Sequence, residues 1–192
     1  MIYKIGRFIV RVVYKLLFRI EGEGLQNIPS EGGVLLCSNH ISNFDPPTVG
    51  LLLKRKVHFM AKAELFDVPV LGMLFKALGA YPVKRGGVSK ESIKMTLTLL
   101  RTGNVIGIFP EGTRKAAADV AAKKGAASFS LRSGAVVIPV AIIGDYKLFR
   151  KIKVVYGPPV DLDEFRDNPG GDAVDLATDK IMAAIRQLKQ GA

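Results

Sequence analysis

Short apolar runs alternate with helix-like segments along most of this chain, and that alternation limits the folds open to it. Five runs read as β-strands, at residues 34–39, 56–62, 105–110, 135–144 and 151–157. Helical patterns fill several of the gaps between them. Such alternation predicts a single α/β domain, in which a mostly parallel or mixed central sheet is flanked by helices.

Three helices are predicted from apolar periodicity and from residues that favour helix ends, at 89–103, 126–134 and 172–189. Ser89 is a plausible N-cap of the first, and Gly103 and Gly134 stand where the first two should end. The third should dock an apolar stripe on the sheet. The acidic, glycine- and proline-bearing segment 161–171 is the one long loop expected.

The first twenty residues show a helical period in which cations share one side. At about 100° per residue, five cations fall within an arc of roughly 120° and apolar residues fill most of the rest; these cations are Lys4, Arg7, Arg11, Lys15 and Arg19. The segment lacks the uninterrupted apolar core of a secretory signal or a spanning helix. We expect residues 1–21 to form an amphipathic helix at a membrane interface and residues 22–192 to form the folded domain. Packing of the apolar face on the core is the alternative, and one helix can do both.

The charge balance indicates an acidic partner. The net charge is +11 and the isoelectric point is near 9.8, which suits nucleic acid, an anionic membrane or a phosphorylated substrate. The single cysteine, Cys37, excludes an intramolecular disulfide, and its apolar surroundings in sequence predict a buried side chain.

One polar loop follows the first predicted strand. The segment "SNHISNFDPP" places His40 five residues before Asp45. Asp45 could cap a helix that begins at Pro46, since aspartate is a favoured N-cap. Alternatively, its carboxylate could orient the imidazole of His40 and make it a general base.

Two further polar clusters also follow strand-like segments. They are "PEGTR", with Glu111, Gly112, Thr113 and Arg114, and "VKRGG", with Lys84 and Arg85. Each alone could be an ordinary surface turn. Because ligand sites in α/β folds collect at the ends of strands, the three clusters together could supply a base, its orienting carboxylate and a clamp for phosphate.

The chain offers no evident nucleophile of its own. Cys37 should be buried, and no Gly-x-Ser-x-Gly elbow is present. The attacking group should therefore come from a substrate, such as a hydroxyl that His40 deprotonates for attack on an acyl thioester. No metal or cofactor is expected, because the only other histidine, His58, lies among core-like residues.

The spacing of "NHISNFD" and the following "FPEGTR" resembles the glycerophospholipid acyltransferase family, particularly the 1-acyl-sn-glycerol-3-phosphate acyltransferases. The resemblance runs from about residue 22 to residue 159. It implies that His40 is the general base, that Asp45 holds it, and that Arg85, Glu111 and Arg114 bind a glycerol phosphate. Pro139 would help to shape the acyl-donor side. Tyr81 and Lys84 depart from the family pattern, which commonly has phenylalanine and a polar residue such as aspartate there.

What the resemblance implies is acyl transfer from acyl-CoA or acyl carrier protein to the free sn-2 hydroxyl of lysophosphatidic acid, giving phosphatidic acid. Other lysolipids or glycerol 3-phosphate are alternative acceptors. A basic membrane-binding module without chemistry is the non-enzyme alternative. We expect no nucleic-acid partner, and a peripheral or monotopic protein on the cytoplasmic face of an anionic phospholipid membrane. Residues 65–75 are a second candidate for membrane contact, burial against the sheet being the alternative.

Overall fold

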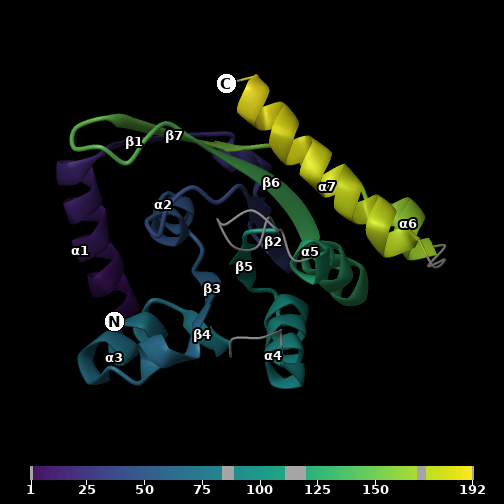
Figure 1. Ribbon diagram of the computed structural model, residues 1–192, viewed down its shortest axis with the longest axis horizontal. Helices are drawn as coiled ribbons and strands as arrows, with labels where there is room; N and C mark the ends of the chain where they lie inside the picture. The colour runs from purple at the N-terminus through teal and green to yellow at the C-terminus, as the bar shows by residue number, and fades with distance from the viewer. Residues whose placement is uncertain (1, 84–88, 111–119, 168–171, 192) are drawn as a thin grey trace.

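A seven-stranded mixed sheet forms the centre of the computed structural model, which describes residues 2–83, 89–110, 120–167 and 172–191. Its order is β1-β7-β6-β2-β5-β3-β4, with β6 and β7 antiparallel and the other neighbouring strands parallel (Figure 1). The strands are β1 (Arg19–Glu23), β2 (Val34–Ser38), β3 (Val57–Lys62), β4 (Ala80–Val83), β5 (Val105–Ile108), β6 (Val136–Ile143) and β7 (Lys151–Tyr156).

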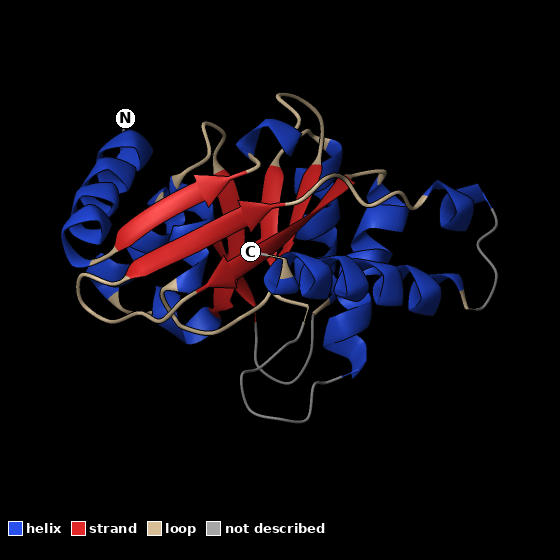
Figure 2. Cartoon of the chain, turned by 90° about the horizontal axis from the view of Figure 1, so that it is seen from above, coloured by secondary structure: helices blue, strands red, loops and turns tan. Residues whose placement is uncertain are grey.

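Helices cover both faces of this sheet and give the domain three layers (Figure 2). The helices are α1 (Ile2–Leu17), α2 (Asp45–Leu51), α3 (Pro69–Ala77), α4 (Lys90–Arg101), α5 (Val120–Ser133), α6 (Asp163–Asp167) and α7 (Ala173–Gln190), with short 3-10 turns η1 (Leu25–Asn27) and η2 (Ala63–Phe66). Helices α1 and α2 pack on one face, and α4, α5 and α7 on the other. In the described part of the chain, no helix combines the length and apolar character needed to cross a bilayer.

The predicted α/β architecture is confirmed, and the five predicted strands and three predicted helices all form. The predicted helix ends also occur: the Ser89 hydroxyl accepts the N–H of Ser92 at 3.2 Å, and Gly103 and Gly134 have φ angles of 78° and 74°. Such left-handed backbone conformations favour glycine at a helix end.

Strands β1 and β4 and helix α6 are among the elements that were not predicted. In β1, exposed and half-buried side chains alternate, but the charged residues and the glycine hide this pattern in the sequence. This edge strand pairs only with β7. The proposed boundary after residue 21 falls inside it, so the sheet begins at Arg19. Strand β4 is four residues long, and α6 lies where a loop was expected in 161–171.

The core divides into two clusters because β2 is buried on both faces. Val34 and Leu36 face the cluster under α1 and α2, and Leu35 and Cys37 face the cluster under α4, α5 and α7. Continuous apolar sequence is typical of a central parallel strand covered on both sides. Burial raises the pKa of the Cys37 thiol, which therefore stays protonated and acts as a core residue, as predicted.

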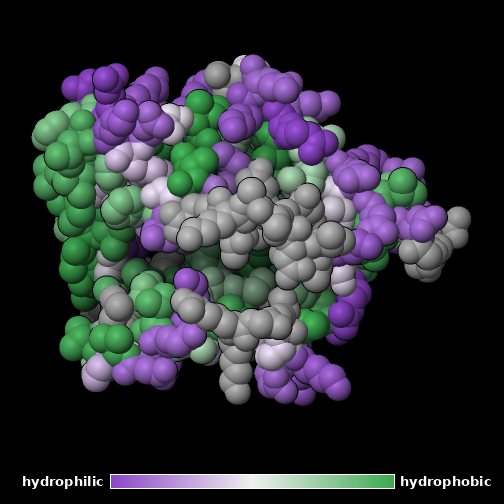
Figure 3. All heavy atoms as spheres, viewed as in Figure 1, coloured by the Kyte–Doolittle hydropathy of each residue, from purple (hydrophilic) through white to green (hydrophobic). Residues whose placement is uncertain are grey.

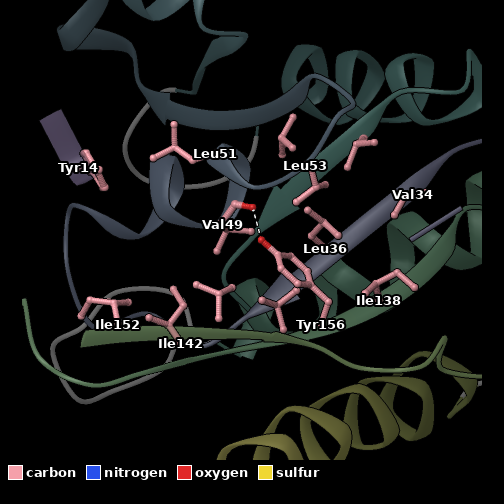
Figure 4. Close-up of a cluster of buried hydrophobic side chains, with 14 of the residues drawn as sticks. Tyr14, Val34, Leu36, Val49, Leu51, Leu53, Ile138, Ile142, Ile152 and Tyr156 are labelled. Atoms are coloured by element: carbon pink, nitrogen blue, oxygen red, sulfur yellow. Dashed lines mark hydrogen bonds between the residues drawn. The ribbon is translucent and has the colours of Figure 1, made fainter. Parts of the chain in front are cut away.

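A buried hydrogen bond ties α2 to strand β7 on the face of the sheet that α2 covers. The hydroxyl of Tyr156, in β7, donates to the carbonyl of Val49 at 2.7 Å (Figure 4). Val49 lies in the last turn of α2, where carbonyl groups lack donors within the helix. The bond thus fixes the position of α2, whose first residue is Asp45.

We predict that Tyr156→Phe lowers the free energy of unfolding by about 1–2 kcal/mol, because the Val49 carbonyl would stay buried without its donor. Urea unfolding measures this, with Tyr81→Phe, which removes another buried hydroxyl contact, to Thr96, as a comparison. An unchanged midpoint for Tyr156→Phe would contradict the role assigned to the bond.

Candidate active site

The loop after β2 is fastened to β6 by the side chain of Asn39. Its amide nitrogen donates to the carbonyl of Ile142 at 3.0 Å, and its oxygen accepts the N–H of Ile142 at 2.7 Å. Asn39 is buried, so both ends of its amide are satisfied by backbone groups of a strand about a hundred residues away. Sequence reasoning used this residue only as part of a motif. An asparagine directly after a fully buried strand is the signal for such an anchor.

Asp45 is fully buried, and one of its carboxylate oxygens organises the loop. Oδ2 accepts the N–H of Ile41 at 2.6 Å, the N–H of Ser42 at 2.7 Å and a contact from His40 Nδ1 at 2.6 Å. No side-chain cap bond is formed at the start of α2, where Phe44 is the N-cap residue. Asp45 therefore does not cap the helix. Its contacts match the alternative, in which its carboxylate orients the imidazole of His40.

These contacts fix the tautomer of His40. A carboxylate only accepts hydrogen bonds, so Nδ1 must carry the proton that it donates to Asp45, and Nε2 is left as the basic nitrogen. The imidazole stacks on Phe109, with ring centroids 4.3 Å apart and planes inclined by 21°. The His40 side chain keeps 18% of its surface exposed. The ring is therefore held in place and can be reached from outside.

A cavity of about 550 Å³ opens beside His40, between α1, α2, β3 and α3. This is a usual size for a small-molecule site. Most of its lining is apolar, and the polar lining residues are Arg7, His40, Asn43 and Lys62. Apolar lining residues include Val10, Pro46, Leu51, Phe59, Leu65, Phe75 and Leu78. The cavity can accept a hydrocarbon chain and present one end of it to the imidazole.

Aromatic rings connect the cavity wall to His40. Phe59 stacks on Phe109 with centroids 6.3 Å apart, and Phe109 stacks on His40. Gly107 of β5 makes this possible, because a Cβ there would lie 2.1 Å from the ring of Phe59. A glycine inside a buried strand commonly marks such a close approach.

A second aromatic group supports the loop from the side of α1. The ring of Phe44 lies within 5.5–6.1 Å of the rings of Tyr14, Phe18 and Tyr146. The Tyr14 hydroxyl donates to the Phe44 carbonyl at 3.2 Å, and the Tyr146 hydroxyl donates to Thr48 Oγ1 at 2.9 Å. Burial, followed by the charge of Asp45, raises the pKa of Tyr14, so its hydroxyl remains a neutral donor beside the carboxylate.

Arg7 is turned toward the protein. Its guanidinium donates to the carbonyls of Leu51, Leu53 and Lys54, at the C-terminal end of α2. A cation at this end of a helix satisfies carbonyl groups and complements the helix dipole. Of the five cations on the basic side of the predicted amphipathic helix, Arg7 therefore points toward the domain, because orphan carbonyls compete for it.

His58 and Tyr81 lie outside the loop, and each has a polar partner within the fold. His58 Nδ1 lies 3.0 Å from the Gly79 carbonyl, and burial, reinforced by the charge of Lys56, lowers the pKa of His58. Tyr81 is buried with its hydroxyl 2.9 Å from Thr96 Oγ1, so this departure from the family pattern has a partner for its extra oxygen.

Among the other predicted site residues, only Pro139 lies in the described part of the chain. Pro139 lies in β6 and does not line the cavity. Six more lie outside the described residues: Lys84, Arg85, Glu111, Gly112, Thr113 and Arg114.

Comparison with known proteins gives concordant similarities. A family model described as acyltransferase matches residues 19–143. The 1-acyl-sn-glycerol-3-phosphate acyltransferase of Bacillus subtilis is 30% identical over 193 residues, which cover 97% of this chain and 96% of that protein. A chloroplastic 1-acyl-sn-glycerol-3-phosphate acyltransferase of Arabidopsis thaliana is 32% identical over 135 residues, which cover 68% of this chain and 38% of that protein.

A solved structure shares the fold. The crystal structure of the 1-acyl-sn-glycerophosphate acyltransferase of Thermotoga maritima matches with a TM-score of 0.70 at 22% identity. The match covers 98% of this chain and 80% of that one.

We predict that Asn39→Asp destabilises the fold at neutral pH by about 2 kcal/mol, because a carboxylate oxygen would face the Ile142 carbonyl. Burial and this repulsion should raise the pKa of the new carboxyl above its unfolded value. The loss should therefore shrink as pH falls through the raised pKa, since the protonated carboxyl can again donate. Asn39→Ala, which introduces no titrating group, is the control. Urea unfolding between pH 4 and 8 measures both, and equal pH profiles would contradict the assignment.

Proposed function

Because this chain belongs to the acyltransferase family, we propose that it transfers an acyl group from an acyl thioester to the sn-2 hydroxyl of lysophosphatidic acid, giving phosphatidic acid. The observation that carries this proposal is the His40–Asp45 pair beside a largely apolar cavity. The relatives named 1-acyl-sn-glycerol-3-phosphate acyltransferases support the choice of acceptor.

The chemistry needs no nucleophile from the protein. Nε2 of His40 removes the proton of the acceptor hydroxyl as that oxygen attacks the thioester carbonyl carbon. Asp45 stabilises the imidazolium that forms. The tetrahedral intermediate then expels the thiolate of the carrier, which takes the proton from His40 Nε2. One ester forms, one thioester breaks and the imidazole returns to its starting tautomer.

The buried position of Asp45 suits this role. Its Oδ2 already accepts two backbone N–H groups, so the carboxylate is held in place without help from the substrate. Preorganised charge of this kind needs no rearrangement when the imidazolium appears. The cavity would hold an acyl chain beside the imidazole of His40, with the polar end of the chain toward the loop after β2.

The acceptor phosphate needs a cationic site, for which we propose Lys84, Arg85 and Arg114. Planar guanidinium groups bind phosphate in a bidentate manner. Glu111, Gly112 and Thr113 would shape the same turn. CoA and acyl carrier protein are the alternative donor carriers, and other lysolipids and glycerol 3-phosphate are the alternative acceptors. A screen of acceptors with one donor separates these alternatives.

We predict that His40→Ala and Asp45→Asn each lower turnover about 10²- to 10⁴-fold, while folding is nearly unchanged. The double variant should be little worse than either single one, because the two residues act as a unit. Release of thiol from acyl-CoA with lysophosphatidic acid measures turnover, and a thermal transition reports folding.

The matched control is His58→Gln, which changes the other histidine, outside the cavity lining. It should keep most of the activity. Near-normal turnover in folded Asp45→Asn would contradict the proposed dyad. A thiol release independent of lysophosphatidic acid would instead contradict the proposed acceptor.

We further propose that the protein is peripheral or monotopic on the cytoplasmic face of an anionic membrane. The outer side of α1 exposes large apolar residues, with Phe8 and Leu16 each 67% exposed; the others are Ile5, Ile9, Val12 and Val13. On and just before neighbouring α3, the exposed apolar residues are Val68, Val70, Met73 and Leu74. Figure 3 shows green surface along this edge of the molecule, over α1 and α3. Exposed apolar area of this extent favours a lipid contact.

We predict that Phe8→Ser combined with Leu16→Ser reduces partitioning to anionic vesicles roughly a hundredfold or more, since each inserted side chain contributes about 1.5–3 kcal/mol. Leu176→Ser, on α7, is the control because it removes an exposed apolar side chain from another part of the surface. Vesicle sedimentation at low and high salt measures binding. Equal sedimentation of the double variant and the parent protein would remove the membrane proposal.

A further inference from the structure

The turn between β6 and β7 exposes two large apolar side chains. Leu148 is 62% exposed and Phe149 is 69% exposed. Phe149 also has a φ angle of 62°, and in the described residues it alone combines a side chain with positive φ. A bulky residue in this region is conformationally unfavourable. The sequence thus keeps an aromatic ring where both solvation and backbone preference disfavour it.

This turn lies against the C-terminal end of α1. The N–H of Phe149 donates to the carbonyl of Leu17 at 2.8 Å, and the N–H of Arg19 donates to the carbonyl of Arg150 at 3.0 Å. Leu16, directly before this junction, belongs to the exposed apolar side of α1. Figure 1 shows the turn beside the end of α1 remote from α3. The apolar side of the helix is therefore bounded by α3 at one end and by this turn at the other.

The charges around the turn suit an anionic surface. Residues 145–151 contain three basic residues and one acidic residue, a balance of +2. Lys147 lies 3.6 Å from Asp145, with both side chains more than 70% exposed, and Lys151 pairs with Glu21 at 2.5 Å. Arg150 is exposed between them. Apolar side chains flanked by cations match a leaflet, in which acyl chains lie beneath a layer of phosphates.

We propose that Leu148 and Phe149 insert into the same leaflet as α1 and form a separate lipid contact at the opposite end of that helix from α3. The inference rests on the proposed membrane association and extends it to a surface that no helix provides. One helix lying on a bilayer can roll about its axis. Lipid contacts near both ends of α1, at α3 and at this turn, would restrict the tilt of the helix. Any contact that lies to one side of the helix axis would also restrict its rolling.

The turn also reaches the candidate dyad. Tyr146, two residues before Leu148, stacks near Phe44 and donates to Thr48, and Phe44 directly precedes Asp45. A lipid contact by this turn would therefore set the position of the His40 loop relative to the headgroups, where a lysolipid hydroxyl lies.

Tryptophan fluorescence tests this proposal cleanly, because the chain contains no tryptophan. Phe149→Trp, Leu148→Trp, Phe8→Trp and Leu176→Trp are each mixed with vesicles of phosphatidylcholine and phosphatidylglycerol whose acyl chains carry bromine. Bromine quenches only a ring that reaches the acyl region. We expect blue-shifted, quenched emission for Phe149→Trp and Leu148→Trp, comparable to Phe8→Trp on α1, and no change for Leu176→Trp on α7.

The outcomes separate the two proposals. Quenching of Phe8→Trp without quenching at 148 or 149 overturns the turn contact and leaves the membrane association of α1 standing. Quenching at none of the four positions overturns both. The proposed acyl transfer is then tested separately, by thiol release with dispersed lysophosphatidic acid. Equal quenching that includes Leu176→Trp shows unoriented adsorption and overturns the turn contact. Because Leu148→Trp and Phe149→Trp both probe this turn, the test remains valid if one of the two variants misfolds.

Discussion

The carboxylate of Asp45 is the group on which the arrangement of the candidate site depends. A carboxylate buried without partners costs several kcal/mol, so the chain around it must supply donors. Two backbone N–H groups, from Ile41 and Ser42, and the imidazole of His40 converge on one oxygen. That convergence bends the loop tightly and leaves the other oxygen, Oδ1, buried without a hydrogen-bond partner in the described structure. Replacing the carboxylate by an amide would therefore alter the hydrogen bonds that orient the imidazole of His40.

The surroundings of this loop come from three distant parts of the chain. Asn39 fastens its start to β6, Tyr14 of α1 donates to the carbonyl before Asp45, and Tyr156 of β7 holds the last turn of α2. Arg7 of α1 binds the same end of α2. Helix α1 thus contacts both ends of the helix that begins with Asp45. The N-terminal helix is part of the support of the dyad as well as a surface element.

The sequence predicted the elements whose signals are local. Apolar runs identified the buried strands, Ser89 and two glycines identified helix ends, and the His40–Asp45 spacing identified the pair itself. Strand β1 was missed because an edge strand has one partner and tolerates alternating charges. The inward turn of Arg7 was missed for a related reason: the carbonyls that it binds come from the end of a helix 44 residues away, and no periodicity within α1 reports them.

The cavity depends on the same long-range packing and could not be predicted from any one segment. Its wall combines Val10 of α1 and Leu78 beside α3 with Phe59 of β3, and Phe59 needs the missing side chain of Gly107 to lie where it does. Gly6 lets α1 approach Leu78 closely, since a Cβ there would lie 3.1 Å from that side chain. The inner sides of α1 and of the α3 region therefore line the cavity while their outer sides expose apolar residues. Under the proposed membrane association, an acyl chain would pass from bilayer to cavity along helices that carry apolar residues on their outer sides and also toward the cavity. The hydroxyl of a lysolipid could then reach His40 without the chain leaving an apolar environment, which is the arrangement that transfer to a membrane-bound acceptor requires.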